Sequence, residues 1–115
     1  MDILEYLQSA GTHGRNHSFD IVLAVYDINF KRKKLNRNEV IISNKDIFNW
    51  IREHGSTISN ITLQYRKAEL AEMGIVTKHH RKRGSGEDIM LTKKGFKIAE
   101  IMKKFIDEVA QVYSQ

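Results

Sequence analysis

The chain contains no cysteine and no proline, and it has no long run of apolar residues. Without cysteine, disulfide scaffolds, thiolate zinc sites and cysteine nucleophiles are excluded, so any metal would need oxygen or nitrogen ligands. No segment approaches the roughly 18 apolar residues of a membrane-spanning helix, and Asp2 stands where a signal peptide carries positive charge. We therefore expect an intracellular, cytoplasmic protein that does not contact a membrane.

The motifs of common enzyme chemistry are also missing. The chain has no H-E-x-x-H metal motif, no glycine-rich phosphate loop and no nucleophile elbow. His79 and His80 would lie on opposite faces of a strand, and Asp107 and Glu108 would point apart on a helix, so neither pair forms a site. We expect a protein that is not an enzyme, without metal or cofactor. The pattern also identifies no small-molecule effector.

The residues that are present have an ordinary globular composition, 41% hydrophobic and 29% charged over 115 residues, which is typical of one folded domain. The net charge of +5 is small, but two runs without acidic residues hold much of the positive charge. The first run contains Lys31, Arg32, Lys33, Lys34 and Arg37. The second run contains Lys78, Arg81, Lys82 and Arg83. Two such runs favour an anionic polymer as partner, and a merely solvated surface is the alternative.

Apolar residues repeat at helical spacing in the first half of the chain. Residues 2–10 form a short amphipathic helix with Leu4 and Leu7, and residues 40–42 are β-branched and predict a brief strand. Between them, residues 18–30 form a helix capped by Ser18. Its single buried face contains Phe19, Val22, Leu23, Tyr26 and Phe30. A capping box at residues 43–46 begins the next helix, and Gly55 ends it.

A further helix is predicted from its N-cap Ser59 to Met73. Leu63 and Leu70 lie on its core side, and hydrogen-bonding side chains lie on the other side. Two helices joined by a short turn form a helix-turn-helix, whose second helix can read base edges in a major groove. The motif alone is a weak signal, because similar helical hairpins occur in proteins that never meet DNA.

The last third of the chain predicts a hairpin and a long helix. Residues 75–80 and 88–92 are predicted to be strands, joined by a basic, glycine-containing tip. The basic tip suits contact with phosphate groups. In the alternative, the hairpin is a sheet edge on which the lysines only prevent pairing with another strand. Thr92 caps a helix through about Tyr113, about 30 Å long, which is more than a small domain covers. Its seam of coiled-coil type contains Ile98, Met102, Phe105, Val109 and Val112. We expect a homodimer, with a helix lying on its own domain as the alternative.

The element order and two motifs resemble the winged helix-turn-helix transcription regulators, in particular the MarR-like, PadR-like and small archaeal or mobile-element regulators. The motifs are L-x-x-x-G-[IL]-[VI] at residues 70–76 and L-T-x-x-G at residues 91–95, and the resemblance covers roughly residues 19–99. It implies one α+β, mostly helical domain over residues 1–115. A winged-helix core spans about 18–92, with an added N-terminal helix and a C-terminal dimerisation helix over about 93–113. One departure is that Arg66 and Lys67 stand where the family usually has an apolar residue.

The resemblance implies sequence-specific binding of double-stranded DNA by a homodimer, most simply a transcriptional repressor or regulator, associated with the nucleoid when bound. The recognition helix would contact DNA through Ser59, Asn60, Thr62, Gln64, Tyr65 and Lys67. The hairpin would contact it through Lys78, His80, Arg81, Lys82 and Arg83, and the first basic run would contact the DNA backbone. The alternatives are a DNA-coating or plasmid-partition protein, and a protein-interaction module that binds an acidic partner without DNA.

Overall fold

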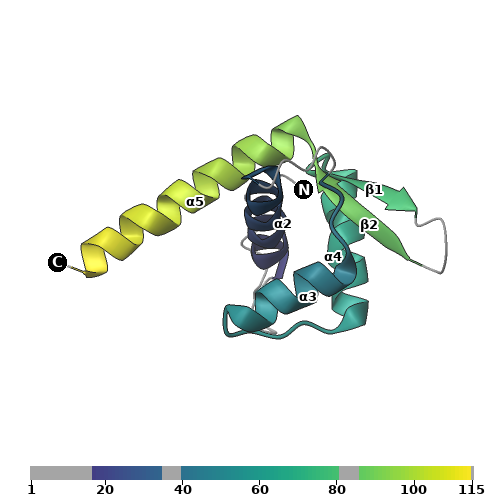
Figure 1. Cartoon of the computed structure of the whole chain (residues 1–115), viewed down its shortest axis with the longest axis horizontal. Coiled ribbons are helices and arrows are strands. Elements are labelled where there is room, and N and C mark those ends of the chain that lie inside the picture. The colour runs from purple at the N-terminus through teal and green to yellow at the C-terminus, as the bar shows by residue number, and fades with distance from the viewer. Residues whose placement is uncertain (1–16, 35–39, 81–85, 115) are drawn as a thin grey trace.

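The structure is a computed structural model that describes residues 17–34, 40–80 and 86–114 (Figure 1). Its described part is α+β and mostly helical, in an arrangement compatible with a winged-helix layout. The elements are α2 (His17–Lys34), α3 (Asn44–Glu53), α4 (Asn60–Glu72), β1 (Val76–His80), β2 (Glu87–Leu91) and α5 (Lys93–Tyr113). The helix expected over residues 2–10, with Leu4 and Leu7, lies outside the described residues. None of the described helices is long and apolar enough to cross a membrane.

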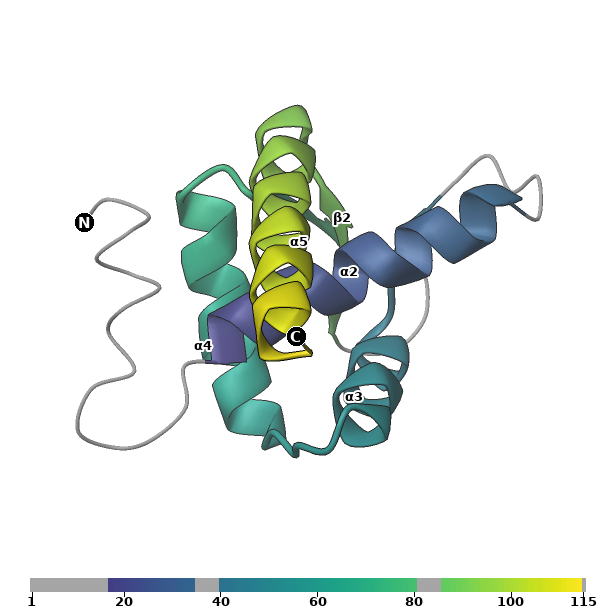
Figure 2. The same cartoon turned by 90° about the vertical axis from the view of Figure 1, so that its left-hand side faces the viewer.

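Helix α2 lies at the centre of the molecule. Figure 2 shows it crossing behind α5, with α4 on one side and α3 on the other, and it contacts α3, α4, α5 and β2. The sequence predicted one buried face beginning at a cap on Ser18. The structure instead places Ser18 inside the helix and buries residues 20–25 on all sides, whereas Phe30 is 50% exposed. The prediction was wrong because one apolar face is typical of a helix that has solvent on its other side, whereas several elements pack around α2.

Helices α3 and α4 begin at the caps predicted from the sequence. The Ser43 hydroxyl accepts a hydrogen bond from the Asp46 backbone N–H at 3.2 Å, and the Asp46 carboxylate accepts one from the Ser43 N–H at 3.3 Å. After α3 the chain turns at Gly55, whose φ of 81° lies in the left-handed region that glycine adopts without strain. The Ser59 hydroxyl then accepts from the Thr62 N–H at 3.1 Å and starts α4. These local signals orient the two helices around a short connection.

Strands β1 and β2 form an antiparallel hairpin in the register Val76↔Leu91 to His80↔Glu87. The strand expected over residues 40–42 is reduced to one β-bridge, in which Ile42 exchanges backbone hydrogen bonds of 2.8 and 3.0 Å with Ile89. The N-cap of α3 at Ser43 stops the pairing from continuing after Ile42. Buried apolar side chains of α2, α3, α4, the hairpin and α5 join in one core.

Helix α5 is docked tightly where it begins and leaves the core where it ends. The Thr92 hydroxyl accepts from the Gly95 N–H at 3.0 Å and donates to the Gly74 carbonyl at 2.6 Å, so this cap also fastens α5 to the end of α4. Gly95 is buried so closely that an added Cβ would lie 2.1 Å from the Ile75 carbonyl oxygen. The second half of α5 projects away from the other elements (Figure 1).

Candidate nucleic-acid interface

The outer face of α4 presents amide and apolar side chains to solvent. Asn60 and Gln64 are exposed, and the Gln64 Nε2 donates to Asn60 Oδ1 over a long 3.4 Å. Ile61 and Tyr65, on the same face, are 70% and 67% exposed. Leu63 and Leu70 are fully buried on the opposite side, as predicted. The helix therefore separates a core side from an outward side that carries hydrogen-bonding groups.

The first turn of α4 adds two hydroxyl groups to this face. Ser59 is exposed and Thr62 is half-buried, and the Ser59 hydroxyl donates to the Thr62 hydroxyl at 2.8 Å. Ser59 and Thr62, both predicted to contact DNA, thus lie at the end of the helix where backbone N–H groups lack helical partners, the end that favours anionic groups.

Lys67 does not lie on this outer face, which corrects its assignment as a DNA contact. Its side chain is only 1% exposed. The Lys67 ammonium donates to Asn44 Oδ1 at 2.6 Å and to the Glu87 carbonyl oxygen. Because Lys67 follows Leu63 by four residues and precedes Leu70 by three, it lies on the buried stripe. Its stem is buried with the apolar residues of this stripe, and its head donates to the two acceptors.

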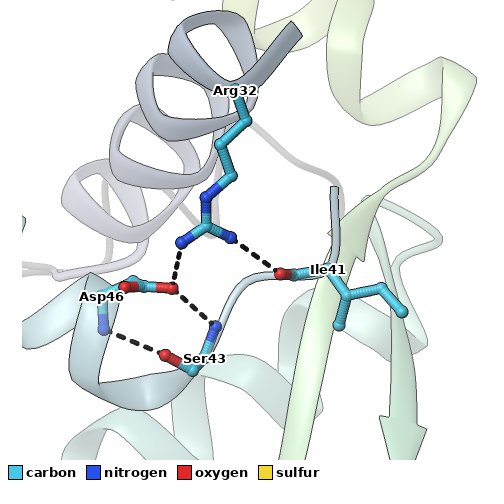
Figure 3. A network of polar contacts seen from close by, with 4 residues as sticks. All are labelled: Arg32, Ile41, Ser43 and Asp46. Atoms are coloured by element: carbon cyan, nitrogen blue, oxygen red, sulfur yellow. Dashed lines mark hydrogen bonds and ion pairs between the residues drawn. The ribbon is translucent and has the colours of Figure 1, made fainter. Parts of the chain in front are cut away.

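Arg32 likewise makes internal contacts (Figure 3), so its assignment to the DNA backbone is also revised. One guanidinium nitrogen donates to the Asp46 carboxylate at 2.6 Å, and the other donates to the Ile41 carbonyl at 3.0 Å. The Arg32 side chain is 24% exposed. Partial burial raises the pKa of Asp46, but hydrogen bonds from Arg32 and Ser43 and the Arg32 charge outweigh it, so the pKa lies below its ordinary value.

Arg32 and Lys67 therefore converge on the first turn of α3, one from α2 and the other from α4. We call this cluster the α3 junction; it consists of Arg32, Ser43, Asn44, Asp46 and Lys67. Through the Glu87 carbonyl it also reaches the start of β2. The junction braces α3 against both α2 and α4. Sequence reasoning missed it because the partners are 14 to 23 residues apart and no local spacing connects them.

On the hairpin, Lys78 and His80 share a strand face with the buried Val76. The Lys78 ammonium lies 3.6 Å from one Glu87 carboxylate oxygen, and His80 Nδ1 lies 4.0 Å from the other. Both side chains remain accessible, at 40% and 86% exposure, and pairs of this kind are weak and exchange readily. Arg81, Lys82 and Arg83 lie outside the described residues.

Around Arg32, the first basic run belongs to the end of α2 and to the residues that follow it. Lys31 and Lys33 are exposed near the end of α2, which ends at Lys34, whereas Arg37 lies outside the described residues. The Lys33 ammonium lies 5.3 Å from the ring centre of Phe96 in α5. Lys33 also lines a pocket of about 500 Å³ together with His79, which belongs to the strand face opposite Lys78. Of the second basic run, only Lys78 lies within the described residues, on the strand face opposite His79.

The predicted seam of α5 is divided between the core and solvent. Met102 is buried and Ile98 is half-buried against the core. Phe105, Val109 and Val112 are 62%, 37% and 68% exposed.

Comparison of the chain with protein-family models, with curated proteins and with solved structures finds no match in any of the three.

Proposed function

We propose that this protein is a winged-helix, sequence-specific double-stranded DNA-binding protein that acts as a homodimer and regulates transcription. In this proposal α4 enters the major groove and the β1–β2 hairpin is the wing that contacts the flanking backbone or minor groove. The observation that carries the proposal is the outer face of α4, with Asn60, Gln64 and Tyr65 exposed on a helix braced from behind through Lys67.

The bracing matters because base reading needs donors and acceptors at defined positions. Leu63 and Leu70 hold the inner side of α4 in the core, and Lys67 ties it to α3 and β2. The amides of Asn60 and Gln64 consequently project from a fixed surface, which lowers the ordering cost of binding. Lys78 and His80 extend from the adjoining hairpin toward the backbone of the duplex.

The homodimer in this proposal is supported by α5. Its second half exposes Phe105, Ile106, Val109 and Val112, and Ile101 is exposed one turn earlier. Contiguous exposed apolar side chains often mark a site of protein–protein contact. Two copies paired through α5 would present two α4 helices to a palindromic site. A footprint limited to one such site supports regulation, whereas a spreading, cooperative footprint would indicate a coating or partition protein.

Fluorescence anisotropy with a duplex selected from a random pool tests the proposal. Replacing Arg81, Lys82 and Arg83 by alanine should lower the affinity for the specific and the random duplex alike. It should also reduce the slope of log affinity against log salt concentration by about 3. Gln64→Ala should reduce discrimination between the duplexes instead. An absence of duplex binding at micromolar protein would contradict the proposal.

That negative result would favour the protein-interaction module. The exposed Ile61 and Tyr65 also suit an apolar contact with a protein.

A further inference from the structure

The outer face of α4 lacks the side chains that usually read guanine. Arginine or lysine, bonded to guanine O6 and N7, makes the commonest specific contact in the major groove. All residues of α4 are described, and its cations are Arg66 and Lys67. The Arg66 guanidinium donates to the Glu69 carboxylate at 3.0 Å, and Lys67 is buried in the α3 junction. Arg66 is half-buried and Lys67 is buried, so neither cation belongs to the exposed face formed by Asn60, Ile61, Gln64 and Tyr65.

The side chains that are exposed on α4 match adenine and thymine. Asparagine and glutamine amides pair with adenine through its N6 donor and N7 acceptor, and Asn60 and Gln64 lie one helical turn apart. Their mutual hydrogen bond of 3.4 Å is long and can be exchanged for a base edge. Ile61 and Tyr65, beside the amides, can contact the C5-methyl group of thymine.

From this face we infer that α4 recognises a half-site of A·T base pairs in the major groove, with amides on adenine and apolar side chains on thymine methyl groups. The inference rests on the DNA binding proposed above and specifies the substrate of that same site. Glu72 is an exposed acid of the kind that accepts a hydrogen bond from the cytosine N4 amino group, but it lies at the C-terminal end of α4. Because recognition helices contact bases through their N-terminal residues, Glu72 does not add a cytosine contact to this half-site.

Modified duplexes test which base edges are read. Half-sites are first selected from a random pool, and affinity is then measured for duplexes in which one adenine becomes 7-deazaadenine or one thymine becomes uracil. 7-Deazaadenine removes only the N7 acceptor, and its expected effect at a read position is an affinity loss of about 5- to 100-fold. Uracil removes only the methyl group, and a loss of about threefold is expected.

A third duplex separates the two grooves. Replacing A·T by inosine·cytosine keeps the minor-groove pattern of an A·T pair but presents the major-groove pattern of a G·C pair. If α4 reads the major groove, inosine·cytosine should bind as poorly as guanine·cytosine at the same position. Full affinity for inosine·cytosine together with no response to uracil would overturn the inference, because A·T preference would then come from the minor groove.

Variants assign the effects to α4. Gln64→Ala should abolish the response to 7-deazaadenine at one position, and Ile61→Ala should abolish the response to uracil at a neighbouring one. Gln64→Arg should shift the preference at its base pair toward guanine. Arg52→Ala is a matched control on the exposed surface of α3 and should leave the responses to 7-deazaadenine, uracil and inosine·cytosine unchanged.

The outcomes distinguish this inference from the proposed function. Selected half-sites with a required guanine that Gln64→Ala makes dispensable would overturn the A·T inference and leave sequence-specific DNA binding intact. A protein that binds no duplex at micromolar concentration would overturn both.

Discussion

At the residue scale, the α3 junction places two cations in positions where each has fixed acceptors. Lys67 is almost fully buried, and a buried ammonium group is tolerated only when hydrogen bonds replace its water. Asn44 Oδ1 and the Glu87 carbonyl provide those bonds. Arg32 and Asp46 form a partly buried pair beside them. The junction thus connects α2, α3, α4 and β2 through polar contacts in addition to the apolar core.

For the Lys67→Met variant, which keeps the length of the stem but loses the ammonium group, we expect the free energy of unfolding to fall by about 1.5–3 kcal/mol. Urea denaturation measures this change, and Lys45→Met, at an exposed position of α3, should change it by less than about 0.5 kcal/mol. The salt slope of DNA binding should not change with Lys67→Met. A slope smaller by about 0.9 with unaltered stability would instead place Lys67 on a phosphate.

Asp46 gives the protein a pH dependence whose sign follows from its lowered pKa. The unfolded chain binds a proton at Asp46 more readily than the folded chain, so the stabilisation is complete above the unfolded pKa and is lost as the pH falls through the folded pKa. We expect Asp46→Asn to lower the free energy of unfolding by about 1 kcal/mol at neutral pH.

Urea denaturation from pH 7 into the acid range measures this effect, with Asp107→Asn on the exposed part of α5 as the control. The difference between the wild type and Asp46→Asn should shrink as the pH falls. A difference that stays constant through the acid range would argue against a role for the Asp46 charge.

At the scale of elements, the connections between helices and strands depend on a few close approaches. The Thr92 hydroxyl reaches both α5 and the end of α4, and Gly95 lets the first turn of α5 lie against the Ile75 carbonyl. The L-T-x-x-G motif therefore has a packing role in this chain. It sets the direction in which α5 leaves the core, and with it the positions of the exposed seam residues.

We expect Gly95→Ala to destabilise the fold by about 3 kcal/mol, although alanine favours a helix over glycine. The reason is that the new Cβ would lie 2.1 Å from a backbone oxygen that cannot rotate away. Thermal unfolding followed by circular dichroism measures the loss. Lys97→Ala, exposed on the same helix, should be close to neutral; a similar small effect for Gly95→Ala would mean that α5 is not docked at Ile75.

At the scale of the whole molecule, the chain divides into a packed body and a projecting half-helix. The body contains one apolar core, to which all the described helices and both strands contribute, while the second half of α5 leaves Phe105 and Val112 more than half exposed. Exposed apolar residues that share one helix face are stabilised by pairing with a second such face. The proposed homodimer gives these residues a partner.

We therefore expect Phe105→Glu to weaken self-association by about 100-fold, because dimer formation would bury an unpaired carboxylate. Sedimentation equilibrium over a range of concentrations measures this, and the helical content should be retained because Phe105 lies outside the core. Gln111→Glu adds a charge on the other side of α5 and serves as the control. A wild-type protein that is monomeric at high concentration, or a Phe105→Glu dimer of unchanged affinity, would contradict the proposed dimer.

Local patterns in the amino-acid sequence predict the features that depend on near neighbours. The caps at Ser43, Ser59 and Thr92 and the turn at Gly55 arise from contacts within a few residues, so local spacing predicts them. The hairpin pairs more distant residues, from Val76 with Leu91 to His80 with Glu87, but its two extended segments and the glycine-containing tip between them are local signals as well. The outer face of α4 follows from the same periodicity, since one buried stripe defines its opposite side.

The packing of distant segments, in contrast, determines where the side chains of Arg32 and Lys67 are directed. Arg32 and Lys67 look like phosphate contacts in the sequence, but Asp46, Asn44 and the Glu87 carbonyl, between 14 and 23 residues away, bind them inside the protein. Burial of α2 on all sides and the reduction of residues 40–42 to one bridge have the same origin. A cation takes whichever acceptors folding brings within reach, and that proximity is set by the packing of distant segments.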